Sequence, residues 1–191
     1  LDEYMPQVVD KGVTEGEFTG LYNEYDYYIL TFGVAPKGDN VWELSTELVK
    51  TKITTKAGET LDVTFTIDTV VNGNDAEFTV TPSNEEDVWY FYTLPKRTYD
   101  AYTDPEGEFN MNDQQFLLLC LQKDIEARRK AGHSDNKIMN DIFHKGTLTL
   151  LAAGLSEHTE YIAQVAGFIV TPEGQISIAT GVTKDVYTSE S

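Results

Sequence analysis

The sequence predicts a mainly β protein made of antiparallel β-sandwich repeats, and three observations support this fold class. Short segments of alternating polar and apolar residues recur along the chain, with turn-forming residues between them. The strand–helix–strand alternation of a parallel sheet is missing from the sequence. The beginning of the chain also matches a stretch near its end, which indicates an internal repeat.

The internal match relates residues whose numbers differ by 134. At a Pro-x-Gly turn we expect a two-residue insertion, after which the offset returns to 134. Residues 57–191 are therefore expected to be one complete repeat with a joint near residues 56–58. Residues 1–56 are expected to be the C-terminal part of another. The matched residues include Tyr27 with Tyr161, Gly33 with Gly167, Pro36 with Pro172, Gly38 with Gly174, and Thr46 with Thr180.

The first repeat is expected to be truncated. Three strands alone leave the inner face of a sandwich uncovered, and an uncovered apolar face is an aggregation hazard. We expect either a missing segment of about 78 residues in front of the chain or a second chain to supply the remaining strands. Packing of residues 1–56 against the complete repeat is the third possibility.

The complete repeat is expected to contain six strands. The first alternates, with every second side chain from Leu61 to Ile67 on one face, and an Asn72-Gly73 turn follows it. The third is dense in aromatic residues and the fifth is the longest. The expected strands are residues 61–67, 76–80, 88–94, 147–153, 159–170 and 175–188.

Residues 96–145 interrupt the strands and are expected to form a helical insertion with two helices between the third and fourth strands. Asn112 and Gln115 have the spacing of an N-terminal capping pair. Leu117, Leu121 and Ile125 form a stripe along one face of the first helix. Because the third and fifth strands are apolar on both faces, we predict that this stripe covers the outer face of their sheet.

The turn before the fifth strand has the spacing of a tyrosine corner, in which a Tyr hydroxyl bonds to backbone a few residues upstream. Leu155 stands six residues before Tyr161, and Leu21 stands six before Tyr27. The chain here resembles the fibronectin type III and immunoglobulin-like families, whose corner often reads Leu-x-Pro-x-Thr-x-Tyr. Leu155, Thr159 and Tyr161 match that pattern, while Glu157 replaces the Pro.

The insertion, the segment "GLSEHTEYIAQVAGF" and the segment "DYYILTFGVAPKG" together resemble tandem sandwich repeats of surface lipoproteins of gut Bacteroidetes. The resemblance covers essentially the whole chain. It implies a noncatalytic, extracytoplasmic module at the outer cell surface. Members of that family carry a lipidated Cys at the mature N-terminus. No Cys stands near residue 1, so the anchor is expected upstream or absent.

Composition and charge exclude several classes of function. The formal net charge of −18 opposes binding to nucleic acid and to anionic lipid surfaces. No apolar stretch is long enough to span a bilayer. The single cysteine, Cys120, lies in an apolar run and is expected to be a buried, inert thiol. The sequence carries no motif for a metal or cofactor, so none is expected.

Two tyrosines in the insertion are the candidate ligand-binding residues. Tyr99 and Tyr102 stand beside Asp100 and Asp104, and aromatic rings next to carboxylates commonly hold sugar rings. The alternative, which we favour, is that these tyrosines fasten the insertion to the sandwich. An oxygen-rich run from Asp104 to Asn112 lacks the glycine and the bidentate Glu of a calcium loop, and we interpret it as a solvated loop.

The sequence thus predicts a noncatalytic binding or spacer module of a secreted or lipid-anchored bacterial surface protein. A glycan or another surface protein is the expected partner. A carbohydrate-binding module that uses the aromatics of the insertion is the first alternative. An accessory domain of a surface hydrolase is the second.

Overall fold

The computed structural model describes residues 12–16, 18, 21, 24–38, 41–172 and 174–190. Its described part is mainly β, with antiparallel sheets and three helices. The chain divides into two compact units, Leu1–Ala57 and Gly58–Ser191, and this division falls at the expected joint.

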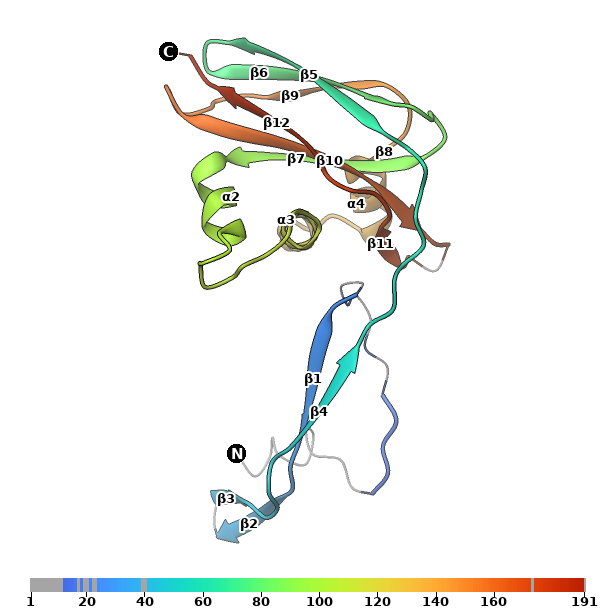
Figure 1. The fold of residues 1–191 in the computed structure, drawn as a ribbon, viewed down its shortest axis with the longest axis vertical. Coiled ribbons are helices and arrows are strands. Elements are labelled where there is room, and N and C mark those ends of the chain that lie inside the picture. Colours follow the sequence, from blue (N-terminus) through green and yellow to red (C-terminus); the bar gives the residue numbers. More distant parts are fainter. Residues whose placement is uncertain are drawn as a thin grey trace. The chain divides into compact units, whose positions relative to one another are not determined.

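In the second unit, a three-stranded antiparallel sheet has the strand order β5-β6-β9 (Figure 1). β5 (Phe65–Asn72) and β6 (Asp75–Pro82) form a hairpin, and β9 (Leu148–Ala152) pairs with the free side of β6. Gly73 has a φ of 64° in the hairpin turn, a value that glycine adopts without strain. β5 begins later than the expected strand, but the alternating residues before it still face the core.

A five-stranded sheet is built around the central strand β10 (Glu160–Val170). β7 (Val88–Pro95) pairs along one side of β10. β12 (Thr183–Thr188) and β11 (Ile176–Ile178) pair with successive parts of its other side. β8 (Phe143–His144) adds a short strand beyond β7. β10 is therefore buried by neighbours along both of its edges.

The two sheets of this unit enclose a buried apolar layer. One cluster joins side chains of β5 and β6 to Trp89 and Val165 on β7 and β10. A second joins Phe78 on β6 to Tyr161 and Tyr187 on β10 and β12. The Trp89 indole Nε1 donates a hydrogen bond to the carbonyl oxygen of Gly146 at 3.1 Å, so its one polar atom is satisfied.

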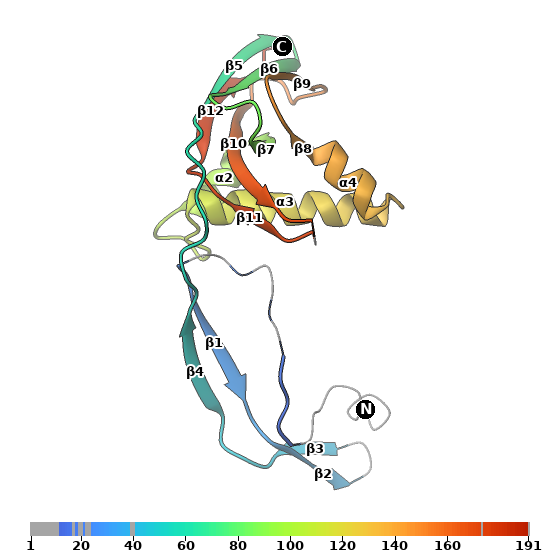
Figure 2. The same ribbon diagram turned by 90° about the vertical axis from the view of Figure 1, so that its right-hand side faces the viewer.

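Helices cover the opposite face of the five-stranded sheet, as Figures 1 and 2 show. α3 (Asp113–Lys130) and α4 (Asp135–Ile142) place Leu117, Leu121, Ile138 and Ile142 against the sheet. Ile125 packs at the margin of the same cluster. The predicted position of the leucine stripe is confirmed. This explains why β7 and β10 are apolar on both faces.

The helix ends agree with the capping residues in the sequence. Asn112 and Gln115 form a reciprocal capping box at the start of α3. The Ser134 side chain accepts a hydrogen bond from the Lys137 backbone N–H at the start of α4. Gly132, with a φ of 85°, follows the end of α3.

The expected pair of helices is wrong in number, because a third helix, α2 (Lys96–Thr103), precedes them. It follows β7 without a loop, and its first turn has no side-chain cap to mark it in the sequence. The expected last strand, residues 175–188, is in fact two strands. Between them the Thr180 hydroxyl accepts a hydrogen bond from the Gly167 backbone N–H at 2.8 Å, which interrupts the backbone ladder.

The corner before β10 places the Tyr161 hydroxyl against upstream backbone. This oxygen accepts a hydrogen bond from the Ser156 N–H at 2.9 Å, and Leu155 packs against the adjacent cluster. The matching corner of the first unit includes residues 22–23, which lie outside the described residues, so the pairing of Leu21 with Tyr27 stays a prediction.

Replacing Tyr161 by phenylalanine is expected to lower the free energy of unfolding by about 0.5–1.5 kcal/mol, because it removes one acceptor from a half-buried backbone N–H. Urea denaturation would measure the change. Tyr28→Phe is the control, since the Tyr28 side chain is largely exposed and its variant should unfold like the parent. Equal behaviour of the two variants would contradict a stabilising corner.

The described residues of the first unit form four strands in two antiparallel pairs. β1 (Asp26–Thr31) pairs with β4 (Val49–Thr54), and β2 (Val34–Gly38) pairs with β3 (Val41–Leu44) (Figure 2). An ion pair between Lys52 and Asp26 at 2.7 Å links β4 to β1. Trp42 lies on β3 opposite Pro36.

These four strands reproduce the pairing of β10, β11 and β12. Each of the six residue pairs between β1 and β4 becomes a pair between β10 and β12 when both numbers are raised by 134. The pairs Val34–Leu44, Ala35–Glu43 and Pro36–Trp42 likewise become pairs between β10 and β11. The expected two-residue shift is therefore wrong: Pro36 corresponds to Val170, and the offset stays constant through the turn.

Details outside the ladders repeat at the same offset. The Gly33 N–H donates to the Thr46 hydroxyl at 2.6 Å, as the Gly167 N–H does to Thr180. Glu24 and His158, before β1 and β10, share a positive φ of 49°. Non-glycine residues rarely adopt this conformation, so its recurrence at matching positions supports a true structural repeat.

Candidate functional site

The structure places the candidate Tyr99 in α2, where its ring meets the Phe116 ring edge-on with centroids 5.4 Å apart. Its hydroxyl donates a hydrogen bond to Asp113 at the start of α3. Lys184 on β12 donates to both the Tyr99 hydroxyl and Asp113, at 3.0 and 2.6 Å. These bonds join α2, α3 and β12.

Tyr102 lies one turn further along α2 and stacks on Phe109, with ring centroids 4.5 Å apart and an interplanar angle of 21°. The same ring also contacts Phe116, which is buried beneath α2. Tyr99 thus makes a contact to the sandwich, through Lys184, as the fastening alternative predicts, whereas the ring contacts of Tyr102 are with residues of the insertion itself.

Each of the two candidate aspartates has a partner within the insertion. Asp100 pairs with Lys96 at 2.7 Å, one helical turn away. Asp104 accepts a hydrogen bond from the Glu106 N–H at 2.9 Å in the loop after α2. Sugar binding by these four residues remains a prediction.

A groove of about 320 Å³ opens where β7 and β9 face α3 and α4. We call it the β7–β9 groove. β8 pairs only with Trp89 and Tyr90, so among the described residues the rest of β7 has no strand partner on this side. β9 is the outer strand of its sheet. The lining residues are Phe78, Tyr90, Phe91, Tyr92, Thr93, Asp124, Arg128, Asp141, Ile142, His144, Leu150, Leu151 and Ala152.

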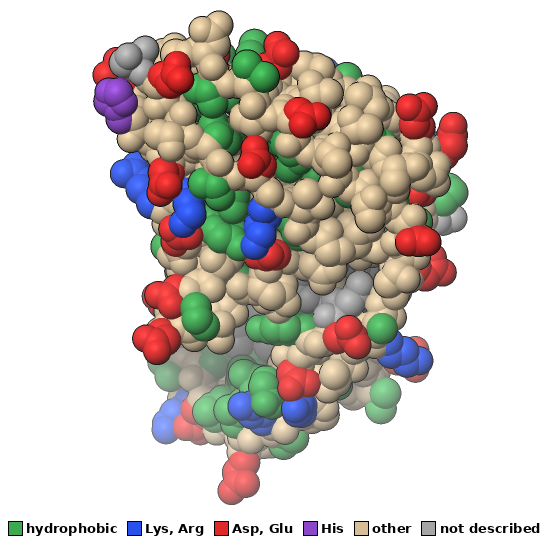
Figure 3. Space-filling model, turned by 45° about the horizontal axis from the view of Figure 1, so that its top comes forward, with side chains coloured by type: hydrophobic (Ala, Val, Ile, Leu, Met, Phe, Trp, Pro, Cys, Tyr) green, Lys and Arg blue, Asp and Glu red, His purple; other side chains and the backbone are tan. Residues whose placement is uncertain are grey.

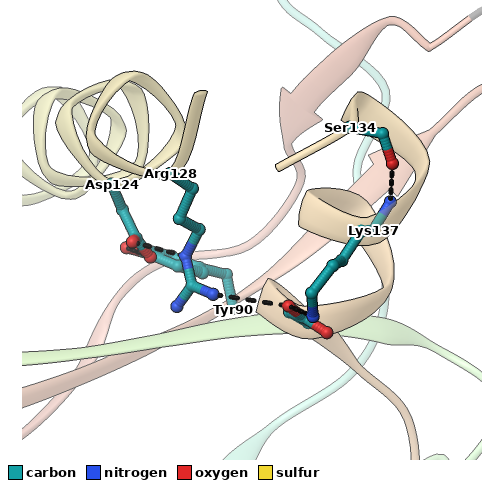
Figure 4. A network of polar contacts seen from close by, with 6 residues as sticks. Tyr90, Asp124, Arg128, Ser134 and Lys137 are labelled. Carbon is teal, nitrogen blue, oxygen red and sulfur yellow. Dashed lines mark hydrogen bonds and ion pairs between the residues drawn. The ribbon is translucent and has the colours of Figure 1, made fainter. Parts of the chain in front are cut away.

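A chain of polar contacts runs along the helical wall of the groove (Figure 4). The Tyr90 hydroxyl donates to Asp124 at 3.4 Å, and Arg128 Nε donates to the other oxygen of Asp124 at 2.7 Å. Arg128 Nη1 lies 3.7 Å from Asp141, which also accepts a hydrogen bond from Lys137 Nζ at 2.6 Å. The network links α3, α4 and β7.

The charges in this network balance, because two carboxylates face one guanidinium and one ammonium group. This contrasts with the acidic side chains scattered over the molecular face in Figure 3. Burial, with a contribution from Asp124, raises the pKa of Tyr90, and burial raises that of Tyr92. Both phenols therefore stay neutral hydrogen-bonding groups at physiological pH. The groove is therefore lined by aromatic rings, neutral hydroxyl groups and charged side chains that are paired within the network.

Burial, with a smaller contribution from Arg128, lowers the pKa of His144. The folded state therefore binds this proton less readily than the unfolded state. The stability that the neutral His144 imidazole contributes is fully present above the pKa of about 6.5 that it has in the unfolded chain. This contribution decreases as the pH falls from that value towards the lower pKa of His144 in the folded state.

Stability is accordingly expected to decrease between pH 7.5 and 5.5 more steeply in the parent than in His144→Gln. The difference in slope should not exceed about 1.4 kcal/mol per pH unit, the limit for one proton. Urea denaturation of both proteins at each pH would measure it. A parallel decrease in the two proteins would show that His144 does not carry the pH dependence.

The described residues contain no group of three His, Cys, Asp or Glu side chains arranged to hold a metal ion. Within that same part of the chain, no helix is long and apolar enough to cross a membrane. Cys120 is buried in α3, and burial raises the pKa of its thiol to about 12. The thiol is thus protonated and unreactive, as the sequence predicts.

Sequence reasoning missed the β7–β9 groove. Its local signals are the four-residue spacings of Asp124 with Arg128 and of Lys137 with Asp141, which also occur in many solvated helices. The remaining lining residues come from strands and a helix far apart in the chain, and pairing alone brings them together.

Comparisons with protein-family models, curated proteins and solved structures find no match to this chain.

Proposed function

We propose that the chain is a noncatalytic binding or spacer module built from tandem immunoglobulin-like or fibronectin type III-like β-sandwich repeats. The observation that carries this proposal is the recurrence of one strand pattern, with identical residue pairing, at an offset of 134 residues. Sandwich domains of this kind occur in many cell-surface proteins. The sequence resemblance extends the proposal to the outer surface of a bacterium, on a secreted or lipid-anchored protein.

Two features of the second unit support the sandwich assignment. The buried layer between its two antiparallel sheets has the arrangement of a sandwich core. The hydrogen bond from Ser156 to the Tyr161 hydroxyl has the form of the corner found in such domains.

A test of the noncatalytic proposal is incubation of the purified chain with a panel of polysaccharides and peptides, followed by mass spectrometry of the products. We expect no turnover. Hydrolysis that is lost in Asp124→Asn or Asp141→Asn, with the fold retained, would instead show that the chain itself is catalytic, because these are the carboxylates of the β7–β9 groove.

Carbohydrate binding is the second candidate function. The β7–β9 groove is a better candidate site for a sugar than the tyrosines of α2. The groove combines the half-buried Tyr92 ring with hydroxyl, carboxylate and guanidinium groups. Sugars bind to such combinations by stacking on the ring and by hydrogen bonds to the polar groups. The balanced charge of the network admits a neutral glycan without an uncompensated ion.

Glycan-array binding by the parent, Tyr92→Ala and Tyr102→Ala tests this candidate. If the groove holds the sugar, Tyr92→Ala should weaken binding at least about tenfold, which corresponds to 1.4 kcal/mol. Tyr102→Ala is the matched control, since that ring packs on Phe109 away from the groove lining, and it should bind like the parent. Loss of binding only in Tyr102→Ala would show that the sugar binds at the insertion and not in the groove. Absence of binding by the parent leaves the spacer function.

A further inference from the structure

The first unit presents a strand edge that its counterpart in the second unit uses for pairing. β10 pairs with β7 on one side and with β11 and β12 on the other. β1 and β2 reproduce only the second of these sides, through β4 and β3. Among the described residues, no strand lies where a counterpart of β7 would pair.

The backbone of β1 is oriented for such pairing. The Tyr25 carbonyl accepts a hydrogen bond from the Thr55 N–H, and the Gly33 carbonyl accepts one from the Ser45 N–H, so both face the β4 side. Because backbone groups of successive residues in a strand point to alternate edges, the groups of Tyr28, Leu30 and Phe32 point to the open edge. In the second unit, the matching groups face β7.

The side chains beside this edge are exposed although their counterparts are buried. Burial in the second unit comes from the strands and helices of residues 58–152, which have no counterpart among the described residues of the first unit. The exposed fractions are 51% for Tyr28 against 2% for Ile162, 54% for Leu30 against 0% for Gln164, and 53% for Phe32 against 0% for Ala166. An exposed row of apolar side chains along an unpaired strand edge is a template for strand addition.

We propose that the open edge of β1 and β2 binds a separate polypeptide segment as an added antiparallel strand with the chemistry of β7. The occupant is an extended segment rich in aromatic residues, like the run from Trp89 to Tyr92 in β7. The pairing of β7 with β10, carried back by 134 residues, sets its register. Leu30 then lies opposite the residue of the added strand that corresponds to Tyr92, and Phe32 lies opposite the one that corresponds to Tyr90. The inference rests on the internal repeat and stands whether or not the chain binds a glycan.

The second unit shows why a β7-like segment fits better than another copy of this chain. A second copy has its own β7 already paired with its own β10, so that strand is not available to bind. In contrast, a β7-like strand would place aromatic rings beside β1 in the same way that Tyr90 and Tyr92 lie beside β10 in the second unit.

The test adds a synthetic peptide with the sequence of residues 86–96, EDVWYFYTLPK, to the full chain and follows amide hydrogen exchange by mass spectrometry. Exchange in residues 26–34 should slow at least about tenfold at saturating peptide, because new backbone hydrogen bonds must open before exchange. Exchange in residues 160–170 should not change. A scrambled peptide of the same composition should have no effect.

Leu30→Pro and Leu30→Ala form a matched pair of chain variants. Both remove the leucine side chain, but only proline removes the N–H that faces the open edge, and an edge strand tolerates that loss. We expect Leu30→Ala to retain the peptide effect and Leu30→Pro to lose it. Unchanged exchange in residues 49–54 would show that β1 and β4 still pair in the proline variant.

No slowing at millimolar peptide, or equal slowing with the scrambled peptide, would overturn the proposal. So would slowing that persists in Leu30→Pro. Sedimentation velocity without peptide tests the other occupant: a dimer whose residues 26–34 are already protected would identify a second copy as the partner and contradict a β7-like segment.

Discussion

Phe78→Ala is expected to lower the free energy of unfolding of the second unit by about 3–5 kcal/mol, the largest loss among the substitutions considered for this protein. Phe78 is fully buried between the two sheets. Its ring contacts Phe91 on β7 and Tyr187 on β12, with centroids 5.0 and 5.1 Å away. Alanine would remove both contacts and leave a cavity that rigid strands cannot close.

Urea denaturation followed by near-ultraviolet circular dichroism would measure this loss. Phe109→Ala is the matched control, because Phe109 lies in the same unit but is 49% exposed in the loop before α3. It should lose less than half as much stability. Similar losses in the two variants would mean that the buried layer between the sheets does not dominate the stability of the unit.

Leu121→Ala is expected to cost about 2–5 kcal/mol, the range for truncating a buried leucine. Leu121 is 2% exposed and packs in one cluster with Tyr90, Ala166 and Phe168 on the five-stranded sheet. The variant therefore measures how strongly α3 is held on the outer face of β7 and β10.

Leu119→Ala provides the control for this second substitution. Leu119 lies on the same helix, is only partly buried, and is not part of the cluster under α3. The same change of side chain should then cost less than half as much. A loss below about 0.5 kcal/mol for Leu121→Ala, the size expected of a surface substitution, would show that α3 does not depend on this contact.

The strands of the second unit were predictable because their alternation and turn residues are local signals. The helix stripe and its position were also predictable. β7 and β10 carry apolar residues on both faces, and such strands need a cover on each side. α2 escaped prediction because its eight residues bury none of their side chains fully and no side-chain cap begins it. The split between β11 and β12 escaped because a side-chain hydroxyl, Thr180, replaces a ladder bond there.

The β7–β9 groove was not predictable in the same way. Tyr92 was visible only as one aromatic residue in a strand, and His144 only as a residue near a helix end. Strand pairing and helix packing bring them within one groove with Asp124 and Arg128. The tyrosines of α2 were the more prominent signal, yet their rings pack on Phe116, which the sequence alone could not show.

The protein's two tryptophans are divided between the units, with Trp42 on β3 of the first and Trp89 in the buried layer of the second. Each unit thus carries its own optical reporter. Trp89→Phe would leave fluorescence that reports only on the first unit, and Trp42→Phe would leave fluorescence from the second. The order in which the units unfold then becomes visible as changes in emission without any added label.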